Sequence, residues 1–447
     1  MAVIVQKFGG TSTASERGWQ ALAQKVKVEI EQGNSPIVVV SAMGRRPAPY
    51  ATDSLLGLVA PYQTSGSARE RDMLMACGEV ISAVVVSHYL RSQGLEAQAF
   101  DGPEAGILAG NSYGQASIIS IDPSNLLKAL QEGKIPVVAG VQGINEQGEV
   151  VTLGRGGSDT TAVALGAAVG ADRVDIFTDV EGVMTADPRC VPQAKVLDKI
   201  SHSEVGEMAN EGAKVLHPRA VEISQSHSVP LRVRSTFSDA PGTSIEAMGE
   251  GVEDEASNLV KQVVNGVAEG SATCLTMENA GAETDPAGTN VKIDDRRLSS
   301  ERVVTGIVSV PGYAMVSIDF QAAADLRNYR LELFDELAKA SLSLDMINVA
   351  GDKVTFLINN SDLNVAKKLL EKFGCSFSML LGCAKLSVVG QAMRGQPGVM
   401  LRICKALADG GADFYYSTDS HITISVVVPE SSLEVAARAV HREFGLG

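Results

Sequence analysis

Short apolar runs alternate with longer helical patterns over the first 245 residues, and this alternation constrains the fold more than any other feature. The runs predicted as strands are residues 3–5, 37–40, 135–138 and 174–178. The patterns predicted as helices are residues 18–32, 72–93, 125–132 and 159–170. Continuous apolar strands are typical of a mainly parallel sheet that is covered on both faces. The region is therefore predicted to be an α/β domain with helices on both sides of the sheet.

The last third of the chain contains an internal repeat. The pattern that begins at Leu337 and ends at Phe373 recurs about 70 residues later, from Leu407 to Phe444. Each copy is predicted as helix, strand, strand, helix, and an apolar strand precedes each copy. This order, present twice, predicts two small α+β modules with antiparallel sheets. Such a pair suits the binding of a small ligand at the module interface better than it suits chemistry.

Residues 246–302 separate the two regions and differ from both. This segment is acidic, rich in Gly, Ala and Asn, and shows no sustained period, which predicts a linker or mobile insert. Within it, residues 260–267 are a candidate for a short strand or helix. The predicted divisions are residues 1–245, 246–302, 303–383 and 384–447, and residues 303–310 are a candidate for pairing with the second module.

The charge balance excludes several classes of partner. The chain has 53 acidic against 38 basic residues and a net charge of −15, whereas nucleic-acid and anionic-membrane binders carry clustered basic residues. No apolar run approaches the roughly 18–20 residues that cross a bilayer, and the first residues lack the basic leader of a signal peptide. We expect no nucleic-acid or membrane partner, and a cytoplasmic location.

The six cysteines include no C-x-x-C pair, and no histidine lies at zinc-ligand spacing from them. Each cysteine is predicted to be a small buried or half-buried residue. Neither a disulfide framework nor a zinc site is expected.

Four glycine-containing loops follow predicted strands in the first region. They are KFGGTS at residues 7–12, SAMG at 41–44, GVQG at 140–143 and GRGGSD at 154–159. At strand ends of an open α/β sheet, such loops let backbone N–H groups approach an anion closely. A small-residue helix follows the last loop at once, so its positive dipole end would face a phosphate or carboxylate. The loops together predict a phosphate or nucleotide site.

The kind of phosphate chemistry follows by elimination. The chain has no G-x-x-x-x-G-K-[ST] loop, no G-x-G-x-x-G after the first strand, and no protein-kinase HRD or DFG motif. What remains are three cations: Lys7 at the start of the first loop, Arg155 within the last loop, and Lys214 in the later segment EGAKVLHP. Fixed cations beside such loops match phosphoryl transfer, in which catalysis is mostly positioning and charge neutralisation.

Six motifs in order resemble a bacterial aspartokinase. They are KFGGTS, SAMG, GRGGSDTTA, FTDVEGVMTADPR, GAKVLHPRAVE and VPLRVRSTF. The resemblance spans essentially all of residues 1–242 and resumes at Val303. It implies an amino-acid-kinase domain, a three-layer αβα fold similar to carbamate kinase, followed by two ACT modules. Residues 45–56 resemble the diaminopimelate-sensitive homodimeric type.

The resemblance implies transfer of the ATP γ-phosphoryl group to the side-chain carboxylate of L-aspartate, with Mg²⁺ bound to the nucleotide. This is the first step in the biosynthesis of lysine, threonine, methionine and diaminopimelate. The catalytic candidates are Lys7 and Asp159. The candidates for binding aspartate are Thr52, Glu79, Arg155 and Ser158. The candidates for binding ATP are Lys7, Phe8, Gly9, Gly10, Ser41, Thr178, Asp179, Met184, Arg189, Lys214 and Val215.

Simpler interpretations stay open for three of these residues. Asp159 alone is compatible with a helix N-cap, Glu79 with an exposed charge on a helix, and Lys214 with a solvated helix residue. Met184 stands where several relatives have a tyrosine that contacts the base.

Two other function classes also stay open: another kinase of this fold that acts on glutamate, acetylglutamate or a nucleotide, and a catalytically silent amino-acid sensor. For the aspartokinase interpretation we expect an amino-acid effector (lysine, threonine or diaminopimelate) between the ACT modules, near Asp345 and Asn348, and a homodimer or higher homo-oligomer.

Overall fold

The first region contains an eight-stranded sheet in the order β10-β12-β11-β9-β1-β2-β6-β3. A computed structural model describes residues 2–62, 67–213, 215–246, 303–320, 325–393 and 396–447. The strands of this sheet are β1 (Val3–Phe8), β2 (Ser35–Val40), β3 (Ala97–Phe100), β6 (Ile135–Ala139), β9 (Arg173–Thr178), β10 (Lys199–Ser201), β11 (Leu231–Ser235) and β12 (Thr243–Glu246). All neighbours pair in parallel except β11 and β12. The predicted mainly parallel sheet is confirmed.

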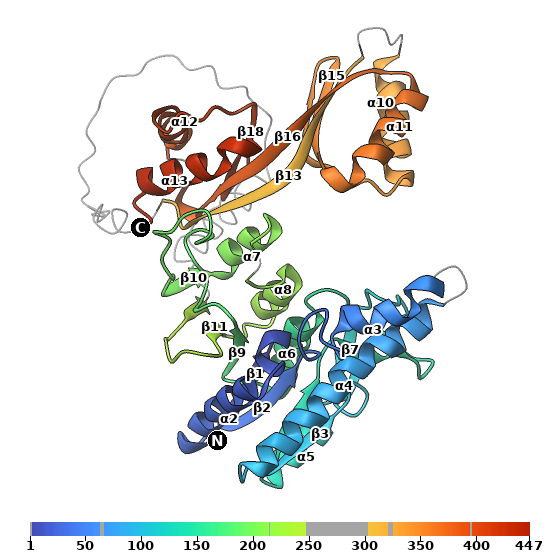
Figure 1. Cartoon of the computed structure of the whole chain (residues 1–447), viewed down its shortest axis with the longest axis vertical. Coiled ribbons are helices and arrows are strands. Elements are labelled where there is room, and N and C mark those ends of the chain that lie inside the picture. Colours follow the sequence, from blue (N-terminus) through green and yellow to red (C-terminus); the bar gives the residue numbers. More distant parts are fainter. Residues whose placement is uncertain (1, 63–66, 214, 247–302, 321–324, 394–395) are drawn as a thin grey trace, which may run out of the picture. The chain divides into compact units, whose positions relative to one another are not determined.

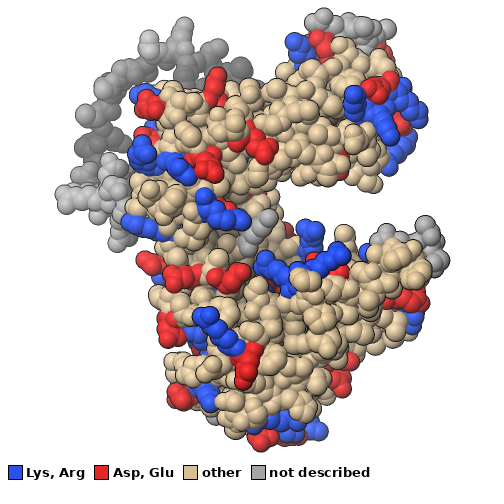
Figure 2. All heavy atoms as spheres, in the orientation of Figure 1, with Lys and Arg blue, Asp and Glu red and all other residues tan. Residues whose placement is uncertain are grey.

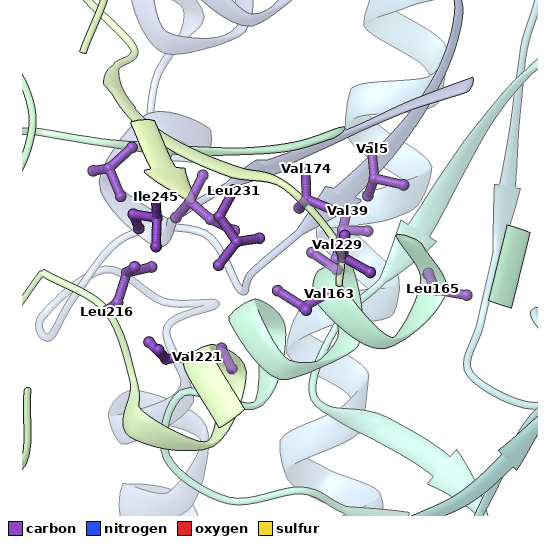
Figure 3. Packing of buried hydrophobic residues seen from close by; sticks show 14 of the residues in the cluster. Val5, Val39, Val163, Leu165, Val174, Leu216, Val221, Val229, Leu231 and Ile245 are labelled. Atoms are coloured by element: carbon purple, nitrogen blue, oxygen red, sulfur yellow. The ribbon is translucent and has the colours of Figure 1, made fainter. Parts of the chain in front are cut away.

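Helices cover both faces of this sheet. Their bounds are α2 (Glu16–Glu31), α4 (Ala68–Ser92), α5 (Ser124–Gln131), α6 (Gly157–Val169), α7 (His202–Asn210) and α8 (Pro218–Ser226). Alternate residues of β2 point to opposite faces, so Val38 and Val40 pack in one core with α2 and α4. Ile37 and Val39 pack in the other core with α5, α6 and α8. Figure 3 shows this second core, in which Val163 and Leu165 of α6 lie against the sheet. The three-layer αβα prediction is confirmed.

The predicted helices are present with ends shifted by a few residues, and local sequence explains the starts. Helix α2 begins after Ser15, whose side chain accepts a hydrogen bond from the Gly18 N–H. Helix α6 is buried along most of its length, because its small residues allow close approach to the sheet.

A second, four-stranded sheet with the order β5-β4-β7-β8 was not predicted. Its strands are β4 (Ile107–Ala109), β5 (Ile118–Ile121), β7 (Gln142–Ile144) and β8 (Val150–Thr152). Three or four residues are too few to show a clear period in the sequence. This sheet matters for the site, because β8 leads directly into the GRGGSD loop.

The last third of the chain forms a six-stranded antiparallel sheet in the order β14-β15-β13-β16-β18-β17. The strands are β13 (Gly306–Asp319), β14 (Asp345–Ala350), β15 (Lys353–Asn359), β16 (Ser376–Val389), β17 (Tyr416–Asp419) and β18 (Thr423–Pro429). The helices are α10 (Leu326–Lys339), α11 (Leu363–Phe373), α12 (Val399–Asp409) and α13 (Leu433–Glu443). Two copies of the predicted β-α-β-β-α order are present.

Two long strands, β13 and β16, run through both modules (Figure 1). Residues 306–311 of β13 pair with residues 384–389 of β16, beside β18. The later half of β13 pairs with β15 on one side and with residues 376–380 of β16 on the other. The first half of β13 therefore lies in the second module, and the first half of β16 lies in the first module. For this reason the two modules share one continuous hydrogen-bonded sheet.

Helix α7 connects the first region to the second module through its carboxylates. Glu204 accepts hydrogen bonds from the Thr305 hydroxyl and the Gln391 N–H, and Glu207 accepts one from Thr423. Residues three apart on a helix share a face, so α7 presents these carboxylates together.

By length and composition alone, α4 could cross a membrane. It is instead the central helix of one core, where Ala83, Val86 and Leu90 pack against β2, β3 and β6. It also buries Asp72 and Glu79, which are polar groups that a bilayer would not satisfy. Acidic and basic side chains are interspersed over the face shown in Figure 2.

The five described cysteines are free thiols. Cys77 is exposed, so its prediction as a buried residue is wrong; it lies on the outer side of α4, while Glu79 faces inward.

The predicted linker at residues 246–302 lies outside the described residues, apart from Glu246 at the end of β12, as does Cys274. Short elements are α1 (Gly10–Thr13), α3 (Thr52–Val59), η1 (Ala60–Tyr62), η2 (Asn360–Asp362), η3 (Gln391–Met393) and η4 (Glu430–Ser432).

Candidate active site

The glycine loops meet at one edge of the eight-stranded sheet. Strands β1, β2 and β6 are parallel neighbours, so the loops that follow them lie at the same, carboxyl edge. The KFGGTS and SAMG loops touch directly, since the Gly44 N–H donates to the Gly10 carbonyl at 2.9 Å. A Cβ at Gly10 would lie 2.8 Å from the Ala42 carbonyl oxygen, so only glycine allows this approach.

Lys7 and Asp159 form an ion pair at the centre of this edge. The Lys7 Nζ lies 2.6 Å from Asp159 Oδ1, and both side chains are largely buried, with 12% and 13% exposure. Apart from this ion pair, Asp159 Oδ1 is buried without a hydrogen-bond partner. Gly156, not Asp159, is the N-cap of α6. The N-cap interpretation of Asp159 is therefore wrong; this residue faces the lysine from the first turn of the helix.

Glu79 is a buried carboxylate with one unpaired oxygen. It is 3% exposed on α4, accepts a weak hydrogen bond from the Ala42 N–H at 3.4 Å, and also bonds the Thr52 hydroxyl. Its Oε2 has no partner. Burial raises the pKa of Glu79 to about 7, against the lowering effect of these hydrogen bonds. The interpretation as an exposed helix charge is wrong, and the geometry is that of a carboxylate ready to receive a cation.

Two serines close the space between the loops. The Ser41 hydroxyl donates to the Ser158 hydroxyl at 2.8 Å, and Ser158 is buried at the start of α6. The Gly140 loop packs on the same side chain, since a Cβ there would lie 2.8 Å from Ser158 Oγ. Ser41, a predicted phosphate ligand, and Ser158, a predicted aspartate ligand, thus touch each other.

Arg155 projects from the turn between β8 and α6. It is exposed, and no ion pair to it is found in the part of the chain that the structure describes. Gly154 and Gly156 on either side have positive φ angles of 78° and 67°, which is backbone that other residues adopt at a cost. The guanidinium is therefore available for a carboxylate ligand.

Thr178 and Asp179 lie at the end of β9, next to β1. The Thr178 hydroxyl donates to Asp179 Oδ1 at 3.1 Å, and the Arg45 guanidinium lies 3.8 Å from Asp179 Oδ2. Phe8 is fully buried and stacks on Phe177 with ring centroids 4.7 Å apart. Only the backbone of Phe8 is therefore free to meet a ligand, and Gly9, whose N–H donates to the Phe177 carbonyl at 3.4 Å, borders the same point.

The other predicted nucleotide residues lie in two further segments. Met184 is half-buried and forms an isolated β-bridge with Val196. Arg189 is exposed and held by Asp187, with Nη2 2.6 Å from Oδ2. Val215 is half-buried, and the predicted site at Lys214 lies outside the described residues.

Asp72 is a residue of this site that the sequence analysis missed. It is buried on α4, two turns before Glu79, and its Oδ2 accepts hydrogen bonds from Gly114 N at 2.9 Å and Thr152 N at 2.7 Å. Thr152 ends β8 and precedes Arg155 by three residues, so Asp72 ties the helix of Glu79 to the loop of Arg155. The seven-residue spacing from Glu79 was the available signal, because it places both carboxylates on one face of a helix.

The predicted effector residues both contact the second module. The Lys385 Nζ on β16 lies 2.5 Å from Asp345 Oδ2, and Asn348 hydrogen-bonds Tyr416 on β17. Both residues therefore lie at a boundary between modules. Residues 321–324, which follow β13 in the chain, lie outside the described residues.

This arrangement brings a buried lysine, tight glycine loops and a helix start to one point, with an unpaired carboxylate and a free arginine beside it. In the described residues no group of three or more His, Cys, Asp or Glu side chains is placed to hold a metal ion. The groups present suit binding of an amino acid next to a phosphate chain.

Comparisons with known proteins agree with the fold and the site. Residues 2–235 match the amino acid kinase family, and residues 386–444 match the ACT domain. The chain is 38% identical to aspartokinase 1 of Bacillus subtilis over 446 residues, which covers all of both chains. It is also 38% identical to the aspartokinase of Corynebacterium glutamicum, over all of this chain and 97% of that one.

Solved structures show the same fold. Escherichia coli aspartokinase III in complex with aspartate and ADP superposes with a TM-score of 0.70 at 22% identity, covering 99% of each chain. Clostridium acetobutylicum aspartate kinase gives a TM-score of 0.71 at 19% identity over both full chains. Because a family match covers more than half of its length and full-length relatives show this identity, the chain belongs to the aspartokinase family.

Proposed function

We propose that the protein transfers the γ-phosphoryl group of ATP to the side-chain carboxylate of L-aspartate, giving 4-phospho-L-aspartate and ADP. The observation that supports this most is the Lys7–Asp159 pair, which lies where the KFGGTS loop meets the start of α6. A lysine at this point can neutralise both the attacking carboxylate and the γ-phosphoryl oxygens.

Aspartate is held by two opposite charges. Arg155 takes the α-carboxylate in a bidentate pair, because a guanidinium matches carboxylate geometry. Glu79 takes the α-ammonium with its unpaired Oε2, and Thr52 and Ser158 complete the pocket. An ammonium group restores the charged form of Glu79, whose raised pKa reflects burial without a cation.

The nucleotide lies across the strand ends next to Lys7. The backbone of Phe8, Gly9 and Gly10 and the Ser41 hydroxyl face its phosphates. We assign Thr178, Asp179 and Met184 to the nucleoside, and Arg189 and Val215 to the phosphates or ribose. Lys214, which is outside the described residues, is assigned to the phosphates or ribose from the sequence alone. Mg²⁺ comes bound to the triphosphate and supplies further positive charge there. The ADP and aspartate bound together in the Escherichia coli relative support this pairing of ligands.

The substrate supplies its own nucleophile. A carboxylate is ionised at neutral pH, so no general base is required, and the residues act by positioning and by reducing charge repulsion. Asp159 orients the Lys7 ammonium through the 2.6 Å contact. In this role Asp159 needs no proton transfer.

The ACT pair senses an amino-acid product. An effector inhibits only if it prefers a conformation in which the catalytic loops are misaligned. We place its site near Asp345 and Asn348, where the two modules meet. The Escherichia coli relative bound to lysine supports an amino-acid effector, and residues 45–56 favour diaminopimelate for this chain.

We also propose a homodimer or a higher homo-oligomer. The edge strand β14 exposes Ile347 and Val349, with 48% and 46% exposure. An unprotected apolar edge strand is a template for pairing with another chain.

An ADP-release assay tests the proposed function. With ATP and Mg²⁺, we expect release of ADP on addition of L-aspartate, and little release with L-glutamate, N-acetylglutamate or UMP. Faster release with one of the other acceptors would show a different kinase of this fold. No release with any acceptor, together with amino-acid binding in a thermal-shift screen, would show a silent sensor.

A further inference from the structure

The motif GAKVLHPRAVE contains a histidine that the proposed mechanism does not use. His217 lies directly before α8, and its ring packs against Gly156 in the turn that carries Arg155. A Cβ at Gly156 would lie 2.2 Å from His217 Cγ and 2.5 Å from Cδ2. The imidazole thus fills the space that any side chain at position 156 would need.

The backbone around His217 is held firmly. It is the N-cap of α8, its carbonyl accepts the Ala220 N–H at 3.0 Å, and Pro218 occupies the first helical position. Two residues on, the Arg219 guanidinium donates to the carbonyls of Ala116 at 3.0 Å and Leu153 at 3.4 Å. Leu153 immediately precedes the Arg155 turn, so α8 holds this turn both by a ring contact and by a hydrogen bond.

The His217 ring has no polar role within the described structure that would explain its place. Its Nδ1 is buried and has no hydrogen-bond partner, a cost that native structures rarely accept without a reason. The contact that the ring does make is with the Gly156 backbone. Shape is therefore what this side chain contributes.

We propose that His217 is a positioning residue for Arg155. Its ring supports the left-handed turn at Gly156, where φ is 67°, and so directs the guanidinium of Arg155 toward the α-carboxylate of the amino-acid substrate. This inference rests on the proposed aspartate kinase activity. A misdirected guanidinium weakens aspartate binding and leaves the nucleotide phosphates in place, because Lys7 and the KFGGTS loop belong to other elements.

Three substitutions separate shape from polarity. His217→Ala removes the ring, His217→Phe keeps a flat ring without nitrogen, and His217→Asn keeps polar atoms but shortens the side chain. We expect Ala and Asn to raise the KM for aspartate roughly 10-fold or more, with the KM for ATP within about 3-fold of wild type. We expect His217→Phe to keep the KM for aspartate and the KM for ATP within about 3-fold of wild type. His227→Ala, at the exposed end of the same helix, is the matched control and should change neither constant.

A double-mutant cycle tests the contact itself. Gly156→Ala alone places a methyl group against the ring, and we expect a large rise in the KM for aspartate. In the His217→Ala background this clash is absent, so the combined effect should be clearly smaller than the product of the two single effects. The cycle compares KM values among impaired variants, so it does not depend on a variant with full activity. Thermal unfolding curves measure whether each variant is folded.

Several results would overturn the proposal. One is that His217→Phe raises the KM for aspartate as much as His217→Ala does, and another is that His217→Asn keeps the wild-type KM. The others are a larger rise in the KM for ATP than in the KM for aspartate, and a double variant whose effect equals the product of the two single effects. These outcomes differ from failure of the proposed function, in which the wild-type protein would release no ADP with aspartate. If the wild-type enzyme is active and His217→Ala has the wild-type KM for aspartate, this inference is wrong and the proposed function stands.

Discussion

Two buried lysines, Lys7 in the catalytic region and Lys385 in the ACT sheet, show how the same pairing of charges serves different ends. Lys7 faces one carboxylate, Asp159, at 2.6 Å. Lys385, with a 5% exposed side chain, faces two: Asp345 at 2.5 Å and Glu211 at 3.2 Å. Glu211 also accepts hydrogen bonds from the Ser387 and Ser425 hydroxyls. The charged groups of the Lys385 cluster are thus fully paired, whereas the Lys7–Asp159 pair leaves Asp159 Oδ1 without a hydrogen bond.

The difference follows from what surrounds each ammonium group. An ammonium has three donors, and around Lys7 the neighbouring loops are glycines, which leave room for an anion. Around Lys385, burial lowers the pKa, but the two carboxylates outweigh this and the pKa ends above its ordinary value. Incomplete pairing, as at Glu79 Oε2, is what we expect of a binding site, and complete pairing is what we expect of a structural cluster.

Lys7→Ala should give the largest effect on rate. We expect kcat to fall roughly 1000-fold or more, because the charge acts most as the phosphoryl group moves. The unfolding temperature should also fall, because the largely buried Asp159 carboxylate loses its cation, but we expect a smaller fall than for Lys385→Met, where two carboxylates lose theirs. Steady-state kinetics and thermal unfolding measure both. Near-normal turnover would remove Lys7 from the mechanism.

Lys385→Met should show the reverse pattern. Removing the ammonium leaves the largely buried Glu211 and the half-exposed Asp345 carboxylates without a cation, which costs about 1–3 kcal/mol in the free energy of unfolding, because solvent screens part of the charge. We expect kcat in the remaining folded protein to stay within about 5-fold of wild type, an estimate that follows from the separation of catalytic and structural roles. Urea unfolding measures the stability. An unchanged midpoint would mean that the cluster contributes nothing, and the comparison would fail.

Glu79→Gln should separate binding from catalysis. It removes a charge-assisted hydrogen bond of about 1.5–3 kcal/mol, so the KM for aspartate should rise about 10- to 100-fold. The KM for ATP should hardly move. If the KM for ATP rises instead, Glu79 borders the nucleotide and not the amino acid. Thr52→Val is a useful companion, since it should give a weaker change of the same kind.

The pH dependence of stability should also report on Glu79. Its pKa is about 7 in the folded protein, against an ordinary value of 4.5 for a solvated glutamate. The folded state therefore binds the proton more tightly than the unfolded chain, and this residue lowers stability progressively as pH rises from about 4.5 to 7. We expect Glu79→Gln to be more stable than wild type at pH 8 and equal to it at pH 4.5. A variant that is less stable at pH 8 would contradict an unpaired buried carboxylate.

The smallest effect on basal rate is expected at Asn348. This residue lies on β14 of the ACT sheet, not on the sheet that carries the KFGGTS loop, and it hydrogen-bonds Tyr416 across the modules. Asn348→Ala should change uninhibited kcat less than about 2-fold while it weakens inhibition by the effector, because coupling between sites is typically about 1–3 kcal/mol. Inhibition curves with lysine, threonine and diaminopimelate measure this. If none of the three inhibits or shifts the melting temperature, the ACT pair serves only for association.

Much of the architecture was predictable because it is encoded locally. Residues 37–40 are apolar at every position, which demands cover on both faces, and both faces are covered. The repeat from Leu337 to Phe444 predicted two similar modules. The strands of the four-stranded sheet, such as β7 (Gln142–Ile144), were missed because so short a run carries no period.

The candidate site was predictable in its residue types but not in its contacts. The glycine loops and the cations Lys7 and Arg155 stand out in the sequence. Neither the burial of Glu79 nor its unpaired oxygen could be derived from it, since both depend on how α4 packs against the loop at Ala42. Asp72 and His217 were missed for the same reason: each acts through a contact with a segment far away in the chain.

The sequence by itself determined the class of each region, the repeat, and the order of the glycine loops, because period, turn residues and small-residue helices are local properties. Only the tertiary structure decided that β13 and β16 are shared between the modules, that Asp159 meets Lys7 and is not a helix cap, and that Lys385 is saturated while Glu79 is not. These facts depend on which distant segments meet. Packing and the burial of charge determine these contacts, and a local sequence pattern does not predict them.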